Sequence, residues 1–102
     1  MTTRNLAIDP KKVQAFCEKH RIRRLALFGS VLRDDFTSVS DVDVLVEFEP
    51  EARVGLIRFG AIERELSALL GRRVDLNTTE SLSRYFRDEV LAEAEYIYDA
   101  AQ

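Results

Sequence analysis

The sequence predicts an α+β fold in which helices cover a small mixed β-sheet of three or more strands. Short apolar, β-branched segments at residues 22–28, 43–48 and 73–77 are typical of strands. Between the second and third of these, apolar residues recur at helical intervals from about residue 55 to residue 70. A strand, a helix and a strand in this order favour a right-handed crossover, so the third strand should run parallel to the second.

The first helix is expected to begin after Asp9 and to end near His20. Asp9 supplies an N-cap, and proline at the next position fits the first turn, where its missing N–H costs nothing. Apolar residues then recur at helical spacing, at Val13, Phe16 and Cys17. The strand at 22–28 follows, and residues 31–33 should begin a short helix that soon dissolves into a loop.

The second strand carries Val44 and Val46 on one face and Leu45 on the other, which is typical of a strand covered on both sides. Pro50 stops it. The next helix should end at Gly71, and its apolar positions are Leu56, Ile57, Phe59, Ile62, Leu66, Leu69 and Leu70. After the third strand, capping residues at 78–83 predict a last helix with the apolar stripe Phe86, Val90, Leu91, Ala94, Ile97 and Tyr98.

The bulk properties predict one soluble domain spanning residues 1–102, in the cytoplasm. The net charge is −3 and apolar residues make up 46%, so neither disorder nor a grip on a long nucleic acid is expected. Cys17 is the only cysteine, which excludes an intrachain disulfide, and no apolar run approaches a membrane span. The basic run 19–24 suits a solvated helix-to-strand junction or, alternatively, a triphosphate or tRNA-backbone contact.

Asp41 and Asp43 are the most informative pair in the chain. Side chains two residues apart on a strand point the same way, and two adjacent carboxylates repel each other unless a cation compensates. Acidic residues also occur at strand beginnings for structural reasons alone. The pair therefore predicts a divalent metal site, most simply for magnesium, if its surroundings agree.

Those surroundings include a turn and a third acid. Gly29 follows the first strand, where a glycine lets backbone amides approach an anion, and Ser30 adds a hydroxyl donor. Arg33 lies one helical turn further on. Asp75 stands in the third strand and joins the acidic pair if that strand lies beside the second. Such a turn facing carboxylates suits a polyphosphate with its metal ions.

The arrangement Gly29-Ser30, Arg33, Ser40-Asp41, Asp43 and Asp75 resembles the nucleotidyltransferases of the DNA polymerase β superfamily, in particular the minimal nucleotidyltransferases that pair with HEPN toxins. The resemblance covers roughly residues 21–98. It implies a palm-like core and transfer of AMP from ATP to a hydroxyl supplied by a tyrosine of a HEPN partner, which would make the chain an antitoxin. Leu32 and Asp34 depart from the alanine and glycine usual in this branch, and Asp34 puts a negative charge near the phosphate turn.

The same resemblance implies a role for each residue. Asp41, Asp43 and Asp75 would hold two Mg²⁺ ions, with Asp75 as candidate general base, while Gly29 and Ser30 would bind the outer phosphates. Arg33 either neutralises phosphate charge or is an ordinary exposed cation, and Ser40 either orients Asp41 or serves the turn. Two other functions stay open: an antitoxin that only masks its partner, and a transferase acting on a small molecule such as an aminoglycoside. A homo- or hetero-oligomer is compatible with either.

Overall fold

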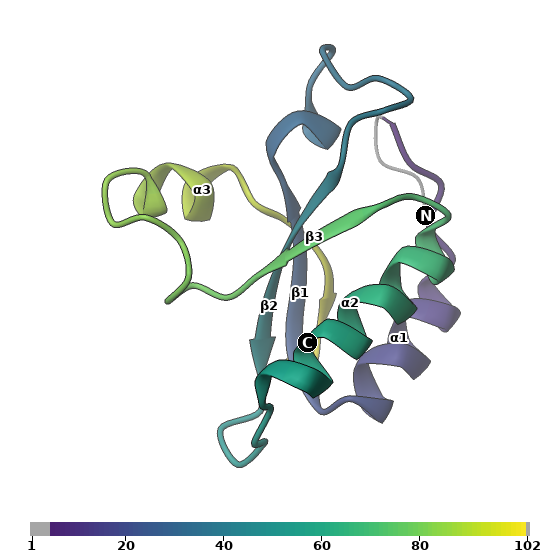
Figure 1. Cartoon of the computed structure of the whole chain (residues 1–102), viewed down its shortest axis with the longest axis vertical. Helices are drawn as coiled ribbons and strands as arrows, with labels where there is room; N and C mark the ends of the chain where they lie inside the picture. The colour runs from purple at the N-terminus through teal and green to yellow at the C-terminus, as the bar shows by residue number, and fades with distance from the viewer. Residues whose placement is uncertain (1–4, 102) are drawn as a thin grey trace.

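The computed structural model describes residues 5–101 and contains a four-stranded sheet in the order β3-β2-β1-β4 (Figure 1). In chain order the elements are α1 (Pro10–Lys19), β1 (Ile22–Phe28), the 3₁₀ turn η1 (Gly29–Leu32), β2 (Val42–Phe48), α2 (Leu56–Leu70), β3 (Val74–Asn77), α3 (Arg87–Glu93) and β4 (Glu95–Asp99). The predicted α+β class and mixed sheet are confirmed. No helix among residues 5–101 is both long and apolar enough to cross a membrane.

The pairing of the strands brings the predicted site residues to one end of the sheet. β1 and β2 are antiparallel with Phe28 opposite Asp43, and β2 and β3 are parallel with Asp43 opposite Asp75. The parallel direction of β3 relative to β2, which the sequence predicts, is confirmed. β4 pairs antiparallel with the other side of β1, which makes β1 a central strand.

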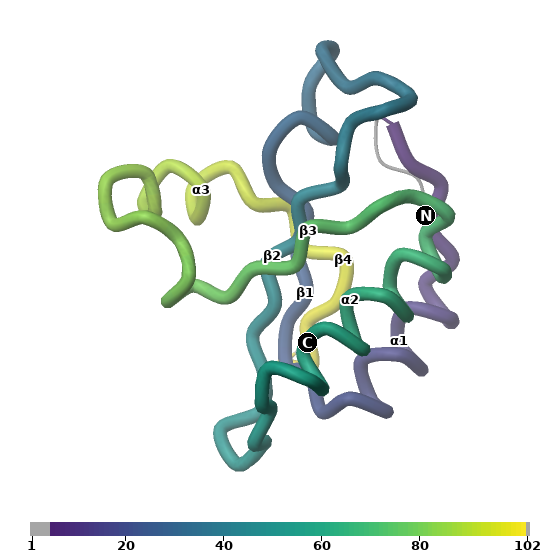
Figure 2. The backbone as a smooth tube through the Cα atoms, in the orientation of Figure 1, coloured from purple at the N-terminus to yellow at the C-terminus, as the bar shows by residue number. Residues whose placement is uncertain are grey.

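The two faces of the sheet are covered unequally. α1 and α2 lie side by side over one face (Figures 1 and 2), where Val44 and Val46 join the main core. Leu45 points to the other face, into a small cluster with Leu82 and Val90. The strand is therefore covered on both sides, as expected, but the second face leaves much more of the sheet uncovered. α3 stands apart from the other two helices on this side (Figure 1).

The first two helices form for the reasons visible in the sequence. The Asp9 side chain accepts a hydrogen bond from the N–H of Lys11 and caps α1, and Gly71 ends α2 in the left-handed conformation with φ of 70°. One part of the α2 prediction is wrong: Leu56 and Ile57 are 92% and 90% exposed. They occupy the first turn of the helix, and the buried residues of α2 begin only at Ile62.

The predicted last helix is the main error in the fold. The helix α3 ends at Glu93, and Ala94, with φ −56° and ψ 134°, leaves the helical conformation. The following residues form β4, whose Ile97 packs into the main core under the sheet. The sequence pattern of the Glu-Tyr-Ile-Tyr-Asp segment is compatible with both a strand and a helix. The strand forms because it can pair with the edge of β1 that β2 leaves free.

The outer edge of β3 is closed by side chains of α2. The N–H of Val74 donates to Oγ of Ser67 at 3.0 Å, and the N–H of Leu76 donates to Oε2 of Glu63 at 2.8 Å. These are the amides that a strand at a sheet edge leaves without a partner. The α2 helix thus contributes both an apolar face to the core and polar partners to the neighbouring backbone.

Candidate active site

The predicted site residues meet where β1 ends and β2 and β3 begin. Asp43 and Asp75 are opposite one another in the parallel pair, and Asp41 lies just before β2 rather than within it. Because Val42, Val44, Val74 and Leu76 point into the main core, the aspartates between them point to the opposite face. That face is the one that α1 and α2 leave open.

Gly29 lies directly against the second acid. Its φ is 76°, a conformation that favours glycine. A Cβ built on Gly29 would overlap Oδ2 of Asp43 and would lie 3.1 Å from its Cγ. The sequence predicts a glycine here for access to an anion; the structure adds that only a glycine leaves space for the Asp43 carboxylate.

The charge on Asp43 is unfavourable in this position. Burial, followed by the nearby carboxylates of Asp75 and Asp41, raises the pKa of the Asp43 carboxyl to about 6, while the Arg33 guanidinium acts in the opposite direction. Asp75 is exposed, and the Asp41 Oδ1 lies 3.9 Å from Nε of Arg73. The carboxylates of Asp41 and Asp75 are therefore close enough to disfavour the ionised form of Asp43.

The donor set suits a hard cation, because all three groups are carboxylates and their mutual repulsion is what a divalent ion relieves. The side chains are not gathered as ligands, however: within residues 5–101 no three acidic, histidine or cysteine side chains are placed to hold a metal ion together. Asp41 and Asp75 are exposed, so solvent surrounds their carboxylates. The three carboxylates fit magnesium in chemistry, although they are not gathered around one point in this structure.

One residue of the site escaped the sequence analysis. The Glu93 carboxylate, at the end of α3, accepts a hydrogen bond from the N–H of Gly29 at 3.0 Å. Its second oxygen lies 3.2 Å from Nη1 of Arg33. Ser30 uses its carbonyl oxygen to accept from the N–H of Arg33 at 2.9 Å and so closes the turn. Nothing in the local pattern of residues 87–93 marks Glu93, because the contact spans 64 positions.

The loop before Asp41 is held by Arg72. Its Nη2 donates to the carbonyl oxygens of Thr37 at 2.7 Å and Ser40 at 3.0 Å, and its guanidinium lies 4.4 Å from the centre of the Phe36 ring. Ser40 Oγ accepts from the N–H of Thr37. Of the two predicted roles for Ser40, the structure displays the turn role, and Arg72 is a second residue that the sequence analysis missed.

The basic run at 19–24 is engaged by acids of neighbouring elements. Lys19 lies 3.0 Å from Glu65 of α2, and Arg24 lies 2.9 Å from Glu47 of β2. These contacts agree with a helix-to-strand junction. His20 is only 9% exposed and packs edge-on against Phe16, so it is not the surface residue that its position at a helix end suggests.

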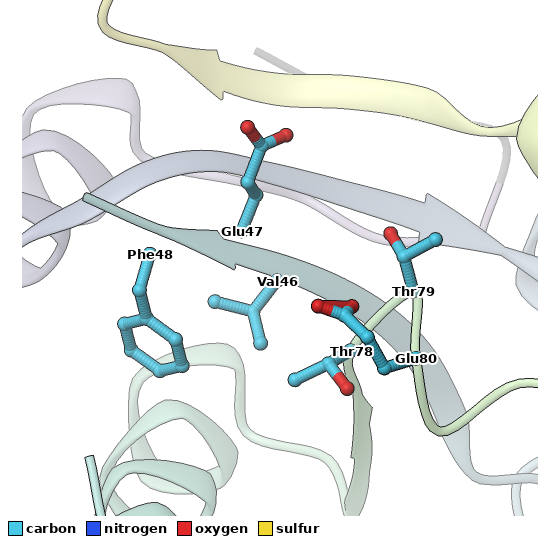
Figure 3. Close-up of a pocket in the computed structure, with 6 residues that line it drawn as sticks. All are labelled: Val46, Glu47, Phe48, Thr78, Thr79 and Glu80. Atoms are coloured by element: carbon cyan, nitrogen blue, oxygen red, sulfur yellow. The ribbon is translucent and has the colours of Figure 1, made fainter. Parts of the chain in front are cut away.

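One surface hollow borders the site, and another lies away from it. The first, of about 290 Å³, is lined by Ser40 and Asp41 together with Arg72 and Arg73. The second, of about 430 Å³, lies at the other end of β2, between Val46, Glu47 and Phe48 and the segment Thr78, Thr79 and Glu80 (Figure 3). Glu47 points to the opposite side of β2 from Val46 (Figure 3). Because this second hollow contains none of the predicted site residues, the chemistry is assigned from the acids and the turn rather than from the size of a cavity.

Comparisons with known proteins agree with the geometry. The model of a family described as "Nucleotidyltransferase domain" matches residues 10–97. Protein adenylyltransferase MntA of Thermococcus cleftensis is 40% identical over 80 residues, which are 78% of this chain and 79% of that protein.

Two solved structures share the fold at low identity. A toxin–antitoxin crystal structure with AMP-PNP has a TM-score of 0.71 at 19% identity, over 90% of this chain and 74% of that one. A tri-AMPylated Shewanella oneidensis HEPN toxin in complex with an MNT antitoxin has a TM-score of 0.63 at 20% identity, over 91% of this chain and 71% of that one. The family match and the MntA relative show that this chain belongs to the nucleotidyltransferase domain family.

Proposed function

We propose that this chain transfers AMP from ATP to a hydroxyl of a protein partner, a tyrosine of a HEPN toxin, and acts in this way as its antitoxin. The observation that carries the proposal is the placement of Asp43 between Gly29, which follows β1, and Asp75 on β3. This placement puts a turn with anion donors beside paired carboxylates. The adenylyltransferase name of the relative and the AMPylated toxin in the fold neighbour support the choice of AMP and of partner.

The donors and the acids of the site have different roles in the proposed reaction. The N–H of Gly29, the hydroxyl of Ser30 and the guanidinium of Arg33 would bind the outer phosphates and stabilise negative charge as pyrophosphate leaves. Asp75 is exposed at the open face and is the best placed of the three acids to accept the proton of an incoming hydroxyl. Arg72 would keep Asp41 in place by holding the loop before it.

Magnesium would be held by Asp41, Asp43 and Asp75, and when bound it supplies positive charge that stabilises the phosphates and favours ionisation of the attacking hydroxyl. The protein favours binding of the ion by placing three carboxylates that repel one another when no cation is bound. Burial is the largest cause of the raised pKa of Asp43, and repulsion from Asp75 and Asp41 adds to it.

We expect the acceptor to come from a partner, because the described residues 5–101 form one small sheet with three helices. The uncovered face beside Asp43 and Asp75 leaves the acids accessible from outside. An acceptor side chain on another protein could therefore reach them.

A second candidate function is masking of the partner without catalysis. It is favoured by two observations: the Glu93 carboxylate occupies the Gly29 N–H, and the three aspartates are not gathered as metal ligands. A binder of this kind would neutralise its partner with or without the acids.

The test is incubation of the chain and its co-purified HEPN partner with ATP labelled on the α-phosphate and Mg²⁺. Label should move to a partner tyrosine with the wild type and not with the double variant Asp41→Asn, Asp43→Asn. The control is Glu49→Gln, Glu51→Gln, which removes the same charge at the far end of β2 and should keep the activity. Neutralisation of the partner by the aspartate variant, at the wild-type dose, would instead establish masking.

A further inference from the structure

A carboxylate of the chain itself occupies donors of the turn that the proposed function assigns to phosphate. Oε1 of Glu93 accepts from the N–H of Gly29 at 3.0 Å, and Oε2 lies 3.2 Å from Nη1 of Arg33. Gly29 begins the turn and Arg33 follows it directly. One anionic side chain thus bridges two of the groups expected to bind the nucleotide.

The Glu93 carboxylate and a nucleotide phosphate can accept hydrogen bonds from the same donors. A backbone N–H and a guanidinium bind carboxylate and phosphate oxygens with similar geometry, and the bonds are strengthened by charge in both cases. A phosphate oxygen cannot take the position of a Glu93 oxygen while Glu93 is there. Even beside the turn, a phosphate would face an additional negative charge.

The electrostatic surroundings make this competition costly for the nucleotide. Asp41, Asp43 and Asp75 already place negative charge at this end of the sheet. Arg33 lies closer to Glu93, at 3.2 Å, than to Asp35, at 3.7 Å. While Glu93 stays in place, its negative charge offsets that of Arg33, and departure of Glu93 would both free a cation and remove an anion.

The Glu93 carboxylate is placed so that it can move away from the Gly29 N–H and from Arg33. Its side chain is 38% exposed, and exposed ion pairs are weak. Val90 is the only buried residue of α3, and Phe86 at its N-cap makes no side-chain capping hydrogen bond. The helix stands away from α1 and α2 (Figure 1), so neither of these helices holds the Glu93 side chain. Rotation of this side chain can release both donors while the backbone stays in place.

We propose that Glu93 is a latch on the phosphate-binding turn: it competes with the phosphates of the nucleotide for the Gly29 N–H and Arg33, and nucleotide binding displaces it. The inference rests on the proposed function of this turn. It assigns Glu93 to control of nucleotide affinity and not to the chemistry of transfer.

The direct test measures binding of inorganic tripolyphosphate and of AMP-PNP by calorimetry in the presence of Mg²⁺. Glu93→Gln keeps the side-chain volume but removes the charge and replaces one of the two acceptor oxygens with a donor, so both ligands should bind about 3- to 5-fold tighter than to the wild type, the upper range for exposed ion pairs. The matched control is Glu95→Gln, an exposed acid two residues away with the same charge change. It should alter affinity by less than about 2-fold.

Unchanged or weaker binding to Glu93→Gln would overturn the latch, and weaker binding would identify Glu93 as a brace that shapes the turn. An equal gain in Glu95→Gln would also overturn it, because general charge would then explain the effect. In an Arg33→Gln background, the gain from Glu93→Gln should shrink, since the two residues act through one contact. A gain of full size there would contradict the mechanism.

A measurement on the wild-type chain covers the case in which Glu93→Gln folds poorly. The ¹³C resonance of the Glu93 carboxyl and the amide resonance of Gly29 should both shift when tripolyphosphate is added, and a Glu93 resonance that stays fixed at saturation would overturn the latch. The two proposals fail separately. AMP transfer with unchanged affinity in Glu93→Gln contradicts the latch alone, whereas tighter tripolyphosphate binding without any AMP transfer by the wild type contradicts the function alone.

Discussion

Replacing Asp43 by asparagine should make the metal-free protein more stable while it abolishes AMP transfer. The pKa of the Asp43 carboxyl is raised from 3.8 to about 6, so the ionised form is less favourable in the folded chain than in the unfolded one. A shift of about two units corresponds to about 3 kcal/mol. Because the side chain is only half-buried and solvent screens it, we expect about half of this, ~1.5 kcal/mol.

The sign of the pH dependence follows from the same shift. As pH rises through 3.8, the unfolded chain ionises at Asp43 before the folded chain does, so the cost to the folded state grows up to about pH 6 and is constant above it. The advantage of Asp43→Asn should therefore be largest above pH 6. It should fall toward zero as the pH approaches 4.

The assay is thermal unfolding in EDTA at several pH values from 4 to 8. At neutral pH the variant should melt about 6 °C above the wild type, since about 1 kcal/mol corresponds to ~4 °C in a domain of this size. The surface control Glu80→Gln should stay within about 0.5 kcal/mol of the wild type. A variant that is no more stable than the wild type at pH 7.5, or whose advantage does not shrink at low pH, would refute the reasoning.

Three further predictions concern other parts of the structure. Gly29→Ala should lose AMP transfer and destabilise the fold by about 1–3 kcal/mol, because a Cβ there meets Asp43 and the residue has a positive φ; denaturant unfolding measures the loss, and wild-type stability would contradict the overlap. Arg72→Ala should lower the rate of AMP transfer about tenfold or more by loosening the loop before the first acid, whereas an unchanged rate would show that the loop keeps its shape alone. Leu56→Ser and Ile57→Ser should each change stability by less than about 0.5 kcal/mol, and a larger loss in urea unfolding would mean that the start of α2 is covered in solution.

Most of the sheet could be predicted because strand, turn and helix signals agreed locally. The strand Ile22–Phe28 and the end of α2 at Gly71 are at the expected positions. The final segment could not be predicted, since residues 90–98 fit both a helical repeat and an alternation. The strand forms because it pairs with the edge of β1, which lies far away in the sequence.

The acidic centre could be predicted for a different reason. The order of strand, helix and strand predicts that β3 runs parallel to β2. Once the two strands are neighbours, their register places Asp43 opposite Asp75. Glu93 and Arg72 act on the turn and the loop from elements far along the chain. Their side chains are ordinary surface acids and bases in the sequence, so only the assembled structure reveals what they contact.

The capped flank of β3 has a consequence for how copies of this protein can associate. With the outward amides of Val74 and Leu76 already satisfied by Ser67 and Glu63, a strand from another molecule finds no free donors there at which to extend the sheet. Intermolecular strand addition is directed instead to the opposite flank, where β4 is outermost. Growth of ordered aggregates from both sides of one molecule is thereby hindered.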